Sequence, residues 1–391
     1  MARCPVCGAR ASYDETECPG CGAELGDSLA VIELDESPPA PGPPRAPEPR
    51  SPRRRVGVVA IVIAAVLAVA AVVQAGGGSS RRPVRRAGGA ARPVFEDATG
   101  VRLALGSSDG VHLVDLDTGR MRTISPAIPG PFDSIVALTG GLVIANGTVA
   151  VGCVGTDPHA CDVELGNAVN VYAGPEPDLV WAVRATLDER LEVADLGLTG
   201  RTGPPIIVLR DRTTVAAAVD SGFVLVSGTT LSLWARGVGE RLVGTDARFV
   251  AARGSLVAWL GRRCSADGCP LHLTDLRANR DRVINGFAES PDAVSGGQFA
   301  PDLHTLAIVL DLHTGAQRML ALVDVDSGFV RLVGPLPLVA SPDARTLAWA
   351  PSGQVVFAAL VGERLAAIRH DGLVELSRVP LPAFVALAAV G

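Results

Sequence analysis

The segment HLVDLDTGRMRTI, at residues 112–124, contains the pattern that decides the fold. An apolar strand ends in an aspartate, a short turn with a glycine follows, and a second strand leads away. The arrangement recurs in LEVADLGLTGR from Leu191, HLTDLRANRDRVI from His272 and LVDVDSGFVRLV from Leu322. Weaker copies are LSLWARGVGERLV from Leu231 and AAIRHDGLVELSRV from Ala366. Residues 94–391 are therefore built from one repeated unit.

The anchors of these copies, where the first strand ends, are spaced at about forty residues. They fall at 115, 195, 235, 275, 324 and 370, so one copy near 155 is eroded. Seven units in residues 94–391 give about 43 residues each, which is the size of a four-stranded propeller blade. The sequence predicts a mainly β fold with a carboxyl-terminal propeller of six to seven blades. A pair of β-sandwiches is the alternative.

The turns between the strands agree with this prediction. Asp117-Thr118-Gly119 and Asp326-Ser327-Gly328 are typical of hairpin turns in which glycine takes a positive φ. Residues 299–307 and 340–348 share the pattern x-P-D-x-x-T-L-A, in which proline presets a tight turn and aspartate bonds its own backbone. At these residues the domain resembles the propeller repeats of TolB-like and WD-like bacterial families, and its Asp-x-x-x-Gly copies resemble quinoprotein-type blades.

A propeller of this kind needs a way to close its ring. The apolar segment Ala383–Val390 is predicted to pair with the first blade near Val101–Leu105. That pairing would cover the strand edges that a linear array of blades exposes.

Four cysteines near the amino terminus predict a metal site. Cys4 and Cys7 form one C-x-x-C pair, Cys18 and Cys21 form a second, and each pair is followed by glycine. Four thiolates complete a tetrahedral site with no open position, so we expect one structural zinc ion. The rival interpretation is a redox dithiol. The segment resembles the zinc-ribbon modules at the amino termini of many bacterial membrane proteins, whose pattern it matches through Leu25.

An uninterrupted apolar block from Val56 to Val73 predicts a transmembrane helix, because eighteen residues give a helix of about 27 Å. A cleaved signal peptide and a buried core helix are the alternatives. The predicted organisation is a zinc ribbon at residues 1–25, an acidic and proline-rich linker at 26–55, a single transmembrane helix at 56–75, a glycine- and arginine-rich linker at 76–93 and the propeller at 94–391.

The other four cysteines predict on which side of the membrane the propeller lies. Cys153 and Cys161, and Cys264 and Cys269, are close pairs in loop-like sequence, which suggests two disulfides and an oxidising compartment. Free thiols, or a second metal site with His159, are the alternatives. Arginines that directly precede the apolar block also favour an amino terminus inside the cell. We therefore expect a cytoplasmic ribbon and an extracytoplasmic propeller.

Motifs that could carry chemistry are few. Residues 106–110 (GSSDG) match G-x-S-x-G, but strands on both sides favour a hairpin turn over a nucleophile elbow. His112 and His272 occupy equivalent blade positions, which suggests packing or a hydrogen bond. Asp115, Asp195, Asp275 and Asp324 are expected to stabilise turns, and Asn146-Gly147-Thr148 is expected to form one. No catalytic or cofactor-binding residue is predicted.

The composition of the chain limits the classes of molecule that it is expected to bind. The net charge is −6 and the pI is about 5.6, which argues against nucleic acid as the main partner. The sequence predicts a single-pass cell-membrane protein that is not an enzyme. Its propeller would bind an envelope protein, peptide or glycan outside, and its ribbon would contact a cytoplasmic protein. The alternative is a membrane-anchored propeller enzyme, such as a hydrolase, a lyase or a quinone-dependent dehydrogenase.

Overall fold

The computed structural model describes residues 2–3, 10–11 and 92–390, except 127, 155–160, 162, 175, 189, 199, 201, 313–316, 340 and 342–344. The chain divides into a unit of residues 1–86 and a unit of residues 87–391. In the first unit, β1 (Ala2–Arg3) pairs with β2 (Arg10–Ala11) in antiparallel fashion. The predicted zinc ligands Cys4, Cys7, Cys18 and Cys21 and the predicted membrane helix at residues 56–75 lie outside the described residues.

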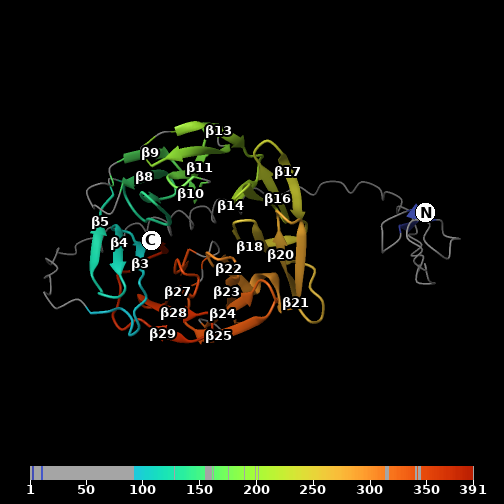
Figure 1. The fold of residues 1–391 in the computed structure, drawn as a ribbon. Coiled ribbons are helices and arrows are strands. Elements are labelled where there is room, and N and C mark those ends of the chain that lie inside the picture. Colours follow the sequence, from blue (N-terminus) through green and yellow to red (C-terminus); the bar gives the residue numbers. More distant parts are fainter. Residues whose placement is uncertain are drawn as a thin grey trace, which may run out of the picture. The chain divides into compact units, whose positions relative to one another are not determined.

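The second unit is a propeller of seven four-stranded antiparallel sheets, which confirms the predicted fold with seven blades (Figure 1). Blade 1 contains the carboxyl-terminal strand β30 (Ala386–Val390) followed by β3 (Arg102–Gly106), β4 (Val111–Asp115) and β5 (Met121–Ile124). In the other blades the strands follow the chain from the channel to the rim. The one described 3₁₀ helix, η2 (Pro291–Ala293), lies between blades 5 and 6.

The strands of blades 2 to 7 have the following bounds. Blade 2 holds β6 (Ser134–Leu138), β7 (Gly141–Ala145), β8 (Val149–Val154) and β9 (Val163–Asn167); blade 3 holds β10 (Asn170–Ala173), β11 (Leu179–Ala185), β12 (Leu191–Gly197) and β13 (Thr202–Val208); blade 4 holds β14 (Thr213–Val219), β15 (Gly222–Ser227), β16 (Thr230–Ala235) and β17 (Gly239–Gly244). Blade 5 holds β18 (Ala247–Arg253), β19 (Leu256–Gly261), β20 (Cys269–Asp275) and β21 (Arg280–Ala288); blade 6 holds β22 (Val294–Phe299), β23 (Thr305–Asp311), β24 (Arg318–Asp324) and β25 (Val330–Leu336); blade 7 holds β26 (Leu347–Trp349), β27 (Val355–Leu360), β28 (Arg364–Arg369) and β29 (Val374–Leu376).

The ring closes where the sequence predicts, although the closing strand starts at Ala386 rather than Ala383. β30 pairs with β3 in antiparallel register, from Ala386 opposite Gly106 to Val390 opposite Arg102. It contacts the innermost strands β6 and β26 of the two neighbouring blades. An ion pair of 2.9 Å between Arg345, before β26, and Asp133, before β6, links the blades on either side of blade 1.

The core is divided among the interfaces between blades. In the described part of the chain, each of the seven pairs of neighbouring blades encloses its own cluster of buried apolar side chains. In β4, Val114 packs toward blade 7 and Val111 packs toward blade 2. Because both faces of a blade are covered, its strands contain longer apolar runs than the alternation of a half-exposed sheet.

The anchor positions found in the sequence mark the end of the third strand of a blade. Asp115, Ala235, Asp275 and Asp324 are the last residues of β4, β16, β20 and β24. In the following turns Gly119 and Gly328 have φ values of +65° and +77°, as predicted. A Cβ atom on Gly119 would lie 1.8 Å from the carbonyl oxygen of Arg92, so this glycine also makes room for the segment that enters the propeller.

Arginines on the rim connect three pairs of blades through these same turns. Arg241 of β17 donates to the carbonyl oxygen of Leu276 at 2.6 Å, and Arg282 of β21 donates to that of Val325 at 2.9 Å. Arg331 of β25 donates to the carbonyl oxygen of Asp371. Each acceptor directly follows an anchor of the next blade. The repeated turn thus presents a carbonyl group to an arginine of its neighbour.

Replacement of Arg282 by alanine is expected to lower the unfolding free energy by about 1–2 kcal/mol. Its guanidinium also donates to the carbonyl oxygen of Asp326, so two charge-assisted hydrogen bonds between blades 5 and 6 are lost. Arg280→Ala is the control, because Arg280 is an exposed arginine on the same strand. Equal urea midpoints for the two variants would show that this link contributes nothing.

Candidate functional site

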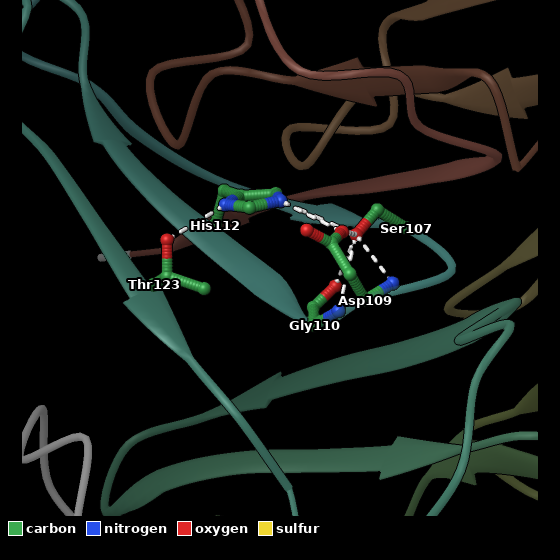
Figure 2. Close-up of polar contacts among 5 residues, drawn as sticks. All are labelled: Ser107, Asp109, Gly110, His112 and Thr123. Atoms are coloured by element: carbon green, nitrogen blue, oxygen red, sulfur yellow. Dashed lines mark hydrogen bonds and ion pairs between the residues drawn. The ribbon is translucent and has the colours of Figure 1, made fainter. Parts of the chain in front are cut away.

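A buried serine and histidine lie together at the β3–β4 turn of blade 1 (Figure 2). The Oγ atom of Ser107 is 3.2 Å from Nε2 of His112, and Nδ1 of His112 is 2.9 Å from Oγ1 of Thr123. The carboxylate of Asp109 accepts from Ser107 Oγ at 2.5 Å and lies 3.4 Å from His112 Nε2. The hydrogen bond from Ser107 and the nearby imidazole lower the pKa of Asp109 against a smaller opposing effect of burial.

This arrangement differs from that of a catalytic triad. In a triad the carboxylate orients the imidazole nitrogen that faces away from the serine, but here Thr123 occupies that nitrogen. Ser107 is 2% exposed, and its hydroxyl also contacts the carbonyl oxygen of Gly110 at 2.7 Å. The cluster therefore stabilises the turn, as predicted for a hairpin at residues 106–110 and for His112.

The second repeated histidine forms a different network in blade 5. The His272 ring stacks on Trp259 with centroids 3.7 Å apart, and its Nδ1 atom is 2.6 Å from Asp281. Thr274 connects Trp259 to Asp281, because its hydroxyl accepts a hydrogen bond from Trp259 Nε1 and donates one to Asp281. This network confirms the prediction of packing or a hydrogen bond for His272, and both are present.

Three of the four repeated aspartates stabilise turns as predicted. Asp115, Asp275 and Asp324 each accept backbone N–H groups two or three residues ahead. Hydrogen bonds from the backbone of Ala278 and from the side chain of Ser327 are the main causes that lower the pKa values of Asp275 and Asp324. Asp195 differs, because it accepts from Trp181 Nε1 at 2.9 Å and pairs with Arg236. The oxygen of Asn146 accepts from Thr148 in the predicted turn.

Polar side chains gather where the innermost strands begin, at one end of the channel. Ser134 donates to Asn170 at 2.9 Å, between β6 and β10. Arg248 pairs with Asp292 at 2.8 Å and donates to the carbonyl oxygen of Val294, between β18 and β22. The Arg345–Asp133 pair lies at the same end, and Oδ1 of Asp133 is a buried oxygen without a hydrogen-bond partner. The sequence offered no sign of these contacts, since their members come from five separate stretches of the chain.

A groove of about 550 Å³ lies on blade 1 and crosses its strands from β30 to β5. Its apolar lining comes from Leu113 and Met121, together with Val390 of the closing strand. Three arginines and one carboxylate complete the lining with Gly119: Arg102, Arg120, Arg122 and Asp115. The groove is not evident from the sequence, because ring closure brings Val390 beside Arg102 from the far end of the chain.

The remaining predicted sites involve cysteines. In the structure Cys153 is joined to Cys161 in blade 2, and Cys264 is joined to Cys269 in blade 5. Cys153, Cys161 and Cys269 are buried, whereas Cys264 is exposed. The described residues contain no cluster of potential metal ligands. No helix in the same part of the chain is long and apolar enough to cross a membrane.

Comparison with known proteins identifies the fold. No protein-family model and no curated protein matches the chain. Among solved structures, the chain is similar to two proteins provisionally named 6-phosphogluconolactonase. The one from Bacteroides fragilis is 12% identical with a TM-score of 0.52, covering 74% of this chain and 98% of that chain. The one from Bacteroides uniformis has the same identity and TM-score, with 75% and 100% covered.

The chain is also similar to an oligogalacturonate lyase in complex with manganese, with 13% identity, a TM-score of 0.50, and 74% of this chain and 90% of that chain covered. At these identities the similarity establishes the fold alone. The chain has the fold of a seven-bladed β-propeller.

Proposed function

We propose that this chain is a single-pass membrane protein whose propeller binds an envelope protein, peptide or glycan outside the cytoplasm. The observation that carries the proposal is the groove on blade 1, where exposed arginines lie beside apolar side chains. Such a mixed surface suits a macromolecular partner, because the apolar contacts add affinity and the charges add specificity. The apolar block at residues 56–73 would anchor the propeller to the membrane.

The amino-terminal segment would contact a second protein in the cytoplasm. Cys4, Cys7, Cys18 and Cys21 would hold one structural zinc ion, which a segment of about 25 residues needs because its own core is too small. The pairing of β1 with β2 is consistent with this proposal, since these two strands flank the segment of the sequence that contains Cys4 and Cys7. The disulfides support an oxidising location for the propeller.

An enzyme is the second candidate, and two observations favour it. Polar side chains lie at the beginnings of several innermost strands, and Asp133, just before β6, has a buried oxygen without a hydrogen-bond partner. The similar solved structures carry the names of a lactonase and a lyase. Turnover of 6-phosphogluconolactone or an oligogalacturonate by the full chain, lost in Asp133→Asn, would favour this candidate over the binding protein.

Site-specific photo-crosslinking in cells tests the binding proposal. A photoreactive residue at position 121, in the groove, is expected to give a discrete adduct with an extracytoplasmic component. The control carries the residue at position 242, which is an apolar position of similar exposure on the rim of blade 4. Identical adducts from both positions, or none from position 121, would contradict a binding function for the groove.

A further inference from the structure

A second pocket, of about 250 Å³, lies between blades 3 and 4. One wall is formed by residues 207–210, at the end of β13 and the start of the connection to blade 4. β13 contains Pro204 and Pro205, and its pairing with β12 shifts register twice, which bends a strand. Blade 2 separates this pocket from the groove on blade 1, so the two sites are distinct (Figure 1).

The opposite wall is one face of blade 4, to which each of its four strands contributes one residue: Thr213, Leu225, Trp234 and Glu240. Trp234 is paired with Phe223 on one side and with Glu240 on the other, and residues that are directly paired share a face. The two-residue spacing along β15 and the pairing of β14 with β15 bring Leu225 and Thr213 to the same face. This face looks toward blade 3, because Phe223 and Leu225 belong to the core between the two blades.

The charged groups of the pocket are Glu240 and Arg210. Ser232 holds the carboxylate of Glu240, because its Oγ atom donates to Oε1 at 2.6 Å and its side chain is buried. Oε2 of Glu240 lies 3.9 Å from Nη2 of Arg210, a separation too long for a direct hydrogen bond. A ligand hydroxyl beside both groups would donate to the carboxylate and accept from the guanidinium.

Two further polar groups of the pocket lack a partner in the protein. The other three tryptophans donate their indole N–H groups to protein oxygens: Trp181, Trp259 and Trp349. Within the described residues, neither the indole N–H of Trp234 nor the hydroxyl of Thr213 has a hydrogen-bond partner. The Trp234 ring stacks on Phe223, with centroids 5.6 Å apart, yet the residue remains partly exposed. An aromatic surface therefore lies beside hydrogen-bonding groups that are available to a ligand.

We infer that this pocket binds one neutral pyranose ring of a glycan. The C–H groups of the ring pack on the indole of Trp234, and its hydroxyls, which both donate and accept, bond to Glu240, Arg210 and Thr213. A volume of about 250 Å³ is below that of pockets for drug-sized ligands and suits a single ring. The inference goes beyond the proposed function, because it assigns a second site and does not depend on the groove.

The charges distinguish a neutral sugar from other ligands that stack on tryptophan. A cationic side chain would be attracted to Trp234 and Glu240, but Arg210 would repel it. An acidic sugar would be attracted to Arg210, but it would meet the carboxylate that Ser232 holds in place. A neutral ring with several hydroxyls avoids both repulsions and uses both charged groups.

Saturation-transfer difference NMR with the full chain, in a detergent without sugar groups, tests this inference. The probes are the methyl glycosides of glucose, galactose, mannose and N-acetylglucosamine. We expect saturable binding of at least one of them, with the strongest transfer to ring C–H protons. The methyl glycosides of glucuronic acid and glucosamine are expected to bind at least tenfold more weakly than the best neutral probe. Failure of all four neutral probes to bind saturably, or a charged probe that binds as tightly, would overturn the inference.

Two variants place the binding in the pocket. In Glu240→Gln the side-chain carbonyl oxygen still accepts from Ser232, so the substitution removes the charged acceptor and keeps the local packing. Arg210→Ala removes a guanidinium that is 86% exposed, so the core is untouched. Each variant is expected to weaken the best neutral probe at least about tenfold, because each removes a hydrogen bond to a charged group.

Glu164→Gln is the matched control, because Glu164 is an exposed carboxylate on the outer strand of blade 2. It is expected to leave binding unchanged. Wild-type affinity in both pocket variants, or an equal loss in the control, would contradict a sugar site between blades 3 and 4. The crosslink from position 121 reports on the groove of blade 1, so failure of this inference and failure of the proposed function are distinguishable.

Discussion

Truncation of the chain after Phe384 is expected to abolish cooperative unfolding of the propeller. The truncation removes β30, which forms five residue pairs with β3 and supplies Leu387 to the core between blades 7 and 1. Loss of this ladder exposes Leu103 and Leu105 and leaves blade 1 without its innermost strand. The lost burial and hydrogen bonds together exceed about 5 kcal/mol, which is comparable to the total stability of a typical domain.

Differential scanning calorimetry and size-exclusion chromatography would measure this effect. We expect no thermal transition and an aggregated elution profile, because the free edge of β3 can pair with other chains. Val385→Ala is the matched control, since this residue precedes the strand and is 48% exposed. A truncated chain that unfolds at the wild-type temperature would refute closure by β30.

Replacement of Phe357 by alanine is expected to lower the unfolding free energy by about 3–5 kcal/mol. Phe357 is fully buried in β27, and its ring lies 5.9 Å from that of Phe95 in the segment that enters the propeller. The substitution leaves a cavity between blades 7 and 1 and removes an aromatic contact to the entering segment.

The same substitution at Phe329 is the control, because that side chain is 62% exposed in the turn before β25. Its removal is expected to change the unfolding free energy by less than about 0.5 kcal/mol. Urea denaturation of both variants gives the comparison. Similar losses at the two positions would mean that the interface between blades 7 and 1 is not packed as described.

The later blades were recognisable in the sequence for a physical reason. Anchors 275, 324 and 370 precede the carbonyl groups that arginines of the preceding blade bind, so the turns keep a similar length. The missing anchor near 155 falls directly after β8, in the connection that the Cys153–Cys161 disulfide closes. At this position a disulfide takes the place of the aspartate- and glycine-containing turn by which the repeat is recognised in other blades.

The candidate site could not be predicted from the sequence. The groove combines neighbouring residues of β4 and β5 with Val390, and only ring closure joins them. The Asp133–Arg345 pair likewise joins two blades that are distant in the chain. The one sign of the groove in the sequence was the pair of arginines at 120 and 122, on either side of Met121. Charged residues are common on edge strands and indicate no ligand by themselves, so this sign did not predict a site.

The location of the propeller is the claim on which the functional proposal depends. Labelling of intact cells with a membrane-impermeant maleimide, with and without a membrane-impermeant reductant, tests it most directly. Cys264 is exposed and its disulfide partner Cys269 is buried, so Cys264 is expected to be the main site of labelling after reduction. Labelling of Cys264 in intact cells only after reduction, with Cys4, Cys7, Cys18 and Cys21 unlabelled until lysis, is the predicted result. Labelling of Cys264 only after lysis, without any need for reductant, would place the propeller in the cytoplasm and contradict the proposed function.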